Sequence, residues 1–185
     1  MSLKQSINQL ICYLFGIDIE ASYRSRIRQL YITYPNSRGE RDIPRNPAYK
    51  NASLTERYDA LLHILHQSSP SSSNSTLTTT KLHAQRLMLK KHARDVFNLI
   101  EEEQPHIKNW SDLGPVEQLY YALVLEEKAA TVSNIEIFRC EDQWCAKRML
   151  EQAFKGKKQT IRRRNLKNSE NGIAPIKKQK VYRHL

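Results

Sequence analysis

The side chains best suited to chemistry in this sequence are bases that gather towards its C-terminal end. The 185-residue chain has a formal net charge of +11, and from residue 155 onwards eleven Lys and Arg stand against a single acid. The rest of the chain is therefore almost neutral. Closely spaced bases bind phosphate and other polyanions, and the same clusters are typical of nuclear localisation signals. The candidate residues are Lys155, Lys157, Lys158, Arg162, Arg163, Arg164, Lys167, Lys177, Lys178 and Lys180.

The composition of this basic segment favours contact with a phosphate backbone over stacking on bases. No aromatic residue lies between Phe154 and Tyr182, whereas proteins that grip single strands usually stack bases on aromatic rings. We therefore expect sequence-independent affinity for DNA or RNA that weakens steeply with salt.

A second, smaller set of bases lies within the body of the chain. It forms a possible secondary basic face made of Arg24, Arg26, Arg28, Lys90 and Lys91. These bases either contact phosphates or an acidic subunit, or are balanced by acids that fold close to them. The segment 79–103 poses the same question, because its bases come first and Glu101, Glu102 and Glu103 come last, the reverse of what a helix dipole favours.

The sequence contains none of the common enzyme motifs: no glycine-rich phosphate loop, no GxSxG elbow and no HExxH. We therefore expect a non-enzymatic protein without catalytic residues, cofactor or small-molecule substrate. Cys140 and Cys145 are five residues apart, which places them about 140° apart around a shared helix, so no metal site is predicted there.

Apolar residues recur at helical spacing along residues 1–155, and no strand-like alternation of useful length occurs. The predicted fold class is therefore all-α: an irregular bundle of about six helices that forms one domain. Prolines and glycines lie between these segments or at their ends. The expected helices cover residues 3–16, 23–34, 54–65, 79–103, 115–130 and 133–154.

Local signals predict where several helices begin and end. Ser53–Glu56 has the spacing of a capping box that opens the third helix, and Ser133–Glu136 has the same spacing at the expected start of the sixth. Gly156 is predicted to end that sixth helix. Trp144, on the same helix, is either a packing residue or a contact for a protein partner.

Two segments are predicted to be flexible. Residues 68–78 are rich in Ser and Thr and form a linker or long loop, and residues 156–185 form a disordered basic tail. No apolar run approaches the length needed to cross a membrane, so no membrane partner is expected.

These features favour a nuclear accessory factor or subunit of a chromatin or transcription assembly. Its helical body would bind protein partners, while the tail would give nuclear import and affinity for nucleic acid. The alternative is an RNA-binding component of a ribonucleoprotein, located in the mitochondrion.

Overall fold

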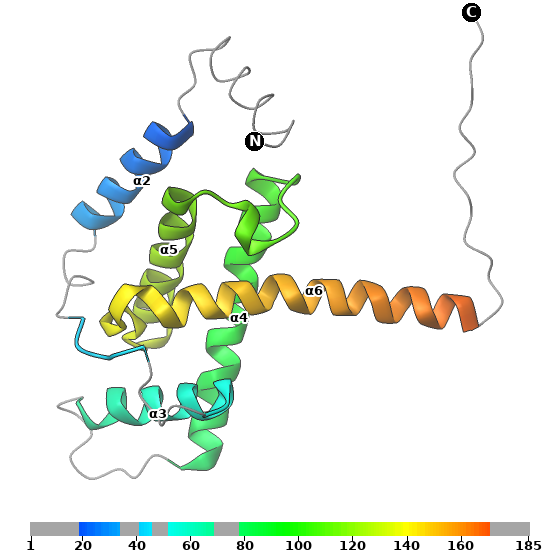
Figure 1. Ribbon diagram of the computed structural model, residues 1–185. Coiled ribbons are helices and arrows are strands. Elements are labelled where there is room, and N and C mark those ends of the chain that lie inside the picture. Colours follow the sequence, from blue (N-terminus) through cyan, green and yellow to red (C-terminus); the bar gives the residue numbers. More distant parts are fainter. Residues whose placement is uncertain (1–18, 34–40, 46–51, 69–77, 171–185) are drawn as a thin grey trace, which may run out of the picture.

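The computed structural model describes residues 19–33, 41–45, 52–68 and 78–170, and the expected all-α class is confirmed (Figure 1). Those ranges contain five α-helices and no strand, and the helix expected at 3–16 lies outside them. Most of the predicted linker, residues 69–77, also lies outside them. The α-helices are α2 (Ile19–Thr33), α3 (Leu54–Gln67), α4 (Thr79–Glu103), α5 (Pro115–Ser133) and α6 (Trp144–Glu170), with short 3-10 turns η3 (Trp110–Asp112), η4 (Ile137–Arg139) and η5 (Glu141–Gln143).

Helix α5 lies at the centre of the fold because it is apolar on nearly every side. It packs against α2, α4 and α6, and Tyr121, Ala122 and Leu125 are fully buried. A helix without a polar face cannot lie at the surface without exposing apolar area. None of the helices in the described ranges is both long and apolar enough to cross a membrane.

The starts of α3 and α4 follow from local hydrogen bonds. Ser53 and Glu56 form the predicted capping box, with the Glu56 carboxylate accepting from the Ser53 amide at 2.6 Å. Thr78 caps α4 by accepting from the Lys81 amide at 3.3 Å. The apolar residues of α4 that recur at helical spacing are buried, namely Leu82, Leu89, Ala93, Val96 and Ile100.

The prediction that Ser133–Glu136 opens the sixth helix is wrong. Ser133 is the last residue of α5, and Asn134 follows in the left-handed conformation (φ 50°, ψ 42°). Its amide donates to the carbonyls of Ala129 and Ala130, which terminates α5. The chain then passes through η4 and η5 before α6 begins at Trp144.

The prediction that Gly156 ends the sixth helix is also wrong. Helix α6 continues through Gly156 to Glu170, so the expected domain boundary at 155/156 falls inside a helix, and residues 156–170 are helical instead of disordered. A glycine ends a helix when it adopts the left-handed conformation, and Gly156 remains helical. Residues 171–185 lie outside the described part of the chain.

Residues 41–45 form a clip that ties the N-terminal part of the chain to the connection between α5 and α6. Ile43 makes a parallel bridge with Cys140, donating to the Arg139 carbonyl at 3.1 Å and accepting from the Glu141 amide at 2.9 Å. Beside it, Arg41 donates two hydrogen bonds of 3.0 and 3.1 Å to Glu126, whose residue surface is 1% exposed.

Candidate functional site

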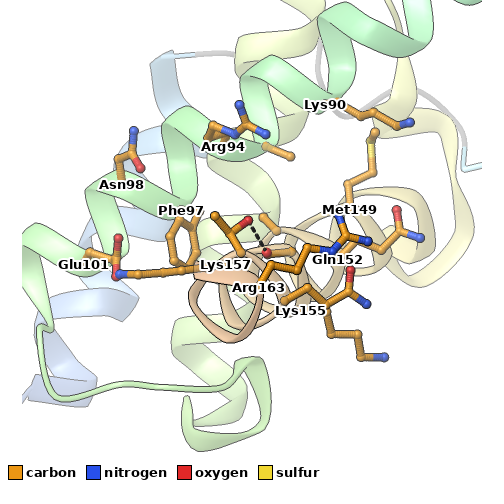
Figure 2. Close-up of a pocket in the computed structure, with 15 residues that line it drawn as sticks. Lys90, Arg94, Phe97, Asn98, Glu101, Met149, Gln152, Lys155, Lys157 and Arg163 are labelled. Carbon is orange, nitrogen blue, oxygen red and sulfur yellow. Dashed lines mark hydrogen bonds and ion pairs between the residues drawn. The ribbon is translucent and has the colours of Figure 1, made fainter. Parts of the chain in front are cut away.

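A basic groove of about 810 Å³ lies where α6 crosses α4, and we call it the α4–α6 groove. Figure 2 shows side chains from both helices lining it. The lining residues on α4 are Lys90, Ala93, Arg94, Phe97, Asn98 and Glu101; those on α6 are Met149, Gln152, Ala153, Lys155, Gly156, Lys157, Gln159, Thr160 and Arg163.

The floor of the groove is apolar and continuous with the protein core. Ala93, Phe97 and Met149 are buried, and Phe97 packs edge to face against Phe154 with ring centroids 4.7 Å apart. Deleting a buried aromatic side chain typically costs about 3–5 kcal/mol. This aromatic pair therefore fixes the crossing point of α4 and α6, and with it the spacing of the groove walls.

The walls of the groove carry five bases and a single acid. Lys157 pairs with that acid, Glu101, and its ammonium lies 5.5 Å from the centre of the Phe97 ring. Lys155 turns to Glu151 at 2.7 Å, and this hydrogen bond is the main reason that the pKa of Glu151 falls below its usual value.

Three of the five bases keep their charge uncompensated. The side chains of Lys90, Arg94 and Arg163 make no hydrogen bond or ion pair with any residue in the described ranges. They come from two helices and line the same groove (Figure 2). Such an arrangement attracts a polyanion and holds it by several contacts at once.

Gly156 leaves the α6 wall of the groove without a side chain close to the crossing point. A methyl group built there meets no atom within 4 Å. A glycine inside a helix costs about 1 kcal/mol relative to alanine, so local packing does not explain its presence. The absence of a side chain leaves the helix backbone accessible from the groove at this point.

The structure brings together only part of the predicted basic tail. Lys155, Lys157 and Arg163 line the groove, whereas Lys158, Arg162 and Arg164 are exposed on other sides of α6. Lys158 donates to the Asn109 side chain. Lys167 also belongs to α6, while Lys177, Lys178 and Lys180 lie outside the described residues.

The secondary basic face does not exist as one surface. Lys90 belongs to the α4–α6 groove, but Lys91 is exposed outside its lining. On α2, Arg24 pairs with Glu20 at 2.6 Å and Arg28 is exposed.

Arg26, the remaining base of that face, has a structural role. It donates two hydrogen bonds of 2.6 and 2.9 Å to Glu103, and its guanidinium lies 4.7 Å from the centre of the Tyr120 ring. Tyr121 adds a 2.8 Å hydrogen bond to the same carboxylate. Above all because Arg26 donates to it, Glu103 has a pKa below its usual value.

These contacts also explain the unfavourable order of charges on α4. Two of its three terminal acids are compensated by neighbouring helices, Glu103 by Arg26 of α2 and Glu101 by Lys157 of α6. Of the two explanations left open by the sequence, neighbouring charges therefore account for Glu101 and Glu103. The bases Lys90 and Arg94 have no such partner in the described ranges and line the groove.

Trp144 is not an exposed partner contact. It is 5% exposed and stacks on Tyr58 with ring centroids 6.3 Å apart and planes 8° apart. Burial of an aromatic residue to this degree indicates a packing role.

Cys140 and Cys145 do not share a helix, so the prediction that they lie about 140° apart around one helix is wrong. Cys140 precedes α6 and Cys145 lies within it, and both are buried and free. Across the described ranges, no three His, Cys, Asp or Glu side chains are placed to hold a metal ion.

The sequence already contained a signal for the groove that composition alone does not reveal. Lys90, Arg94, Phe97 and Glu101 recur at spacings of three and four, which places them along one face of a helix. The same spacing runs through Met149, Gln152, Gly156, Thr160 and Arg163, straight across the glycine.

No protein-family model matches the chain, and no curated protein or solved structure matches it either. The class that the described residues define is an all-α protein with a basic interhelical groove.

Proposed function

We propose that this protein is a non-enzymatic nuclear accessory factor that binds nucleic acid through the sugar-phosphate backbone. The observation that supports this proposal is the α4–α6 groove, where Lys90, Arg94 and Arg163 from two helices are uncompensated within the described residues. Lys and Arg that neutralise phosphates release counterions, so several such bases give strong, salt-dependent binding. Other helical surfaces would bind the protein partners of a chromatin or transcription assembly.

The proposal is tested by removing the three groove charges together. In the variant Lys90→Gln/Arg94→Gln/Arg163→Gln, we expect weaker binding to a mixed-sequence DNA duplex, measured by fluorescence anisotropy over 50–200 mM salt. Each lost phosphate contact changes the slope of log K against log salt by about 0.9, so the loss of two or three contacts should lower the slope by about 1.8 to 2.7. The measurement thus counts contacts as well as affinity.

A matched control removes three exposed bases from outside the groove. The variant Arg28→Gln/Lys81→Gln/Lys91→Gln has the same net charge as the groove variant, and its three positions are exposed. We expect its slope of log K against log salt to differ from the wild-type slope by no more than about 0.9, the change that corresponds to one phosphate contact. Equal losses in both variants would mean that overall charge, not the groove, drives binding.

Nuclear location is tested separately by imaging a tagged full-length chain. We expect nuclear signal, and loss of that signal when the arginines at 162–164 and the lysines at 177, 178 and 180 are replaced by glutamine. Mitochondrial signal would instead support the ribonucleoprotein alternative, in which the same groove would bind structured RNA.

A further inference from the structure

The second half of α6 projects from the helical body as an arm. From Lys155 to Leu166 every side chain is exposed, although the helix continues to Glu170 (Figure 1). The fifteen residues that follow Lys155 extend about 22 Å, since each residue of an α-helix adds about 1.5 Å. We call residues 156–170 the α6 arm.

The three consecutive arginines of the α6 arm point to different sides of the helix. Arg162, Arg163 and Arg164 are consecutive, so they leave the helix axis about 100° from one another. Arg163 faces the α4–α6 groove, which places Arg162 and Arg164 on its two flanks, nearly opposite each other. Residues 156–169 include no acid to balance them. A helix that lies on a flat polyanion needs bases on one side, whereas this one has them on both flanks.

The face between those flanks carries side chains that can contact bases. Gln159, Thr160 and Arg163 all line the α4–α6 groove on this face. In the DNA major groove, Gln forms hydrogen bonds with adenine and Arg with guanine. The Thr hydroxyl can form a hydrogen bond with a base edge, and the Thr methyl group can contact the methyl group of thymine. Lys90 and Arg94 of α4 border the same groove, and phosphate contacts beside a reading helix fix its position.

We propose that the α6 arm enters the major groove of duplex DNA, with Gln159 and Arg163 towards the base edges and Arg162 and Arg164 towards the two flanking backbones. A helix about 10–12 Å wide fits the roughly 12 Å major groove of B-DNA. The deep, narrow major groove of an RNA duplex does not admit side chains, and the arm has no aromatic residue for stacking on single strands. This inference rests on the proposed function and specifies its substrate.

The first test compares three nucleic acids of one length and sequence at one salt concentration: a DNA duplex, an RNA duplex and single-stranded DNA. We expect the DNA duplex to bind at least tenfold more tightly than either of the others. Equal binding of all three, or tighter binding of RNA or of the single strand, would overturn the major-groove inference but not the proposed function. Absence of binding to all three would overturn both.

The second test breaks the helix of the arm without changing its charge. Ile161 is 47% exposed and lies on the side of α6 away from the groove. Proline at this position removes a helical hydrogen bond and clashes with the preceding turn. We expect Ile161→Pro to lose the preference for the DNA duplex while still binding polyanions, and Ile161→Ala to keep that preference.

Circular dichroism and a thermal melt verify that the body of the Ile161→Pro variant stays folded. Retention of the full DNA preference by this variant would overturn the proposal. A final measurement uses methylation of guanine N7, an atom that lies in the major groove. At saturating wild-type protein we expect N7 protection on the bound duplex, and unchanged methylation would likewise overturn the proposal.

Discussion

Replacing Gly156 separates the stability of α6 from its function, because the two should change in opposite directions. Gly156 lies inside α6, and a methyl group built there meets no atom within 4 Å. The variant Gly156→Ala therefore adds helix propensity without a steric penalty. Alanine is about 1 kcal/mol more favourable than glycine in a helix interior, which corresponds to about a fivefold change in a local opening equilibrium.

Native-state hydrogen exchange is the appropriate assay, since the arm makes few contacts with the core and need not open together with the whole protein. We expect the amides of residues 157–161 to exchange about fivefold more slowly in Gly156→Ala. Unchanged or faster exchange would refute the conclusion that α6 runs unbroken through this glycine.

A larger side chain at the same position tests why the glycine is there. Leucine also favours the helix over glycine, but its side chain would extend into the α4–α6 groove. We expect Gly156→Leu to slow exchange and yet weaken binding to duplex DNA at least tenfold. The matched control is Ala84→Leu, an exposed position of α4 outside the groove, which should leave binding unchanged. Full binding by Gly156→Leu would mean that no ligand approaches the helix there.

Three further predictions concern the body of the protein. Arg26→Ala removes the cation from the partly buried Glu103 carboxylate and should lower the free energy of unfolding, measured by urea denaturation, by about 1–2 kcal/mol. Arg24→Ala, at an exposed ion pair, should change it by less than about 0.5 kcal/mol, and equal effects would contradict the structural role of Arg26. Burial lowers the pKa of His92, so the folded state favours its neutral form. The free energy of unfolding should therefore be highest above the unfolded pKa of about 6.5 and decrease as the pH falls below it, and His92→Gln should abolish this dependence in urea midpoints measured against pH. Phe154→Ala deletes the aromatic contact beneath the groove and should cost about 3–5 kcal/mol, with a cost below about 1 kcal/mol showing that the helix crossing is held elsewhere.

The helices that could be predicted from sequence are those whose ends are specified by neighbouring residues. Thr79–Glu103 begins at a Thr cap, and its buried side chains recur at helical spacing, so its bounds follow from local chemistry alone. The start of α3 is predictable for the same reason, because the capping box of Ser53 and Glu56 depends only on two residues three positions apart.

The boundary between α5 and α6 and the end of α6 could not be predicted, because the local sequence at each is compatible with two different structures. Ser133–Glu136 has the spacing of a capping box, but Asn134 in the left-handed conformation ends α5 at the same place. Gly156 can either end a helix or remain within one, and its neighbours do not decide which.

The groove depends on tertiary structure and was therefore only partly predictable. Arg163 was expected to bind polyanions, and Lys90 was assigned to a different basic face. Their shared groove arises from the crossing of α4 and α6, which is fixed by packing between Phe97 and Phe154, residues 57 positions apart in the chain. By contrast, Trp144 could be placed in the core or on a surface only once the position of Tyr58 was known.

The clip at residues 41–45 sets a limit on how far the protein can be shortened for biophysical work. Arg41 supplies the positive charge beside the buried side chain of Glu126, and Ile43 forms a parallel bridge with Cys140 in the connection between α5 and α6. Burial already raises the pKa of Glu126. A fragment starting after residue 45 would leave this buried carboxyl without its cation, so that it would take up a proton or remain as an unpaired charge, and the fold would lose stability. Expression trials of the helices that form the α4–α6 groove should therefore retain the segment before α3, even though it is remote from the arm in sequence.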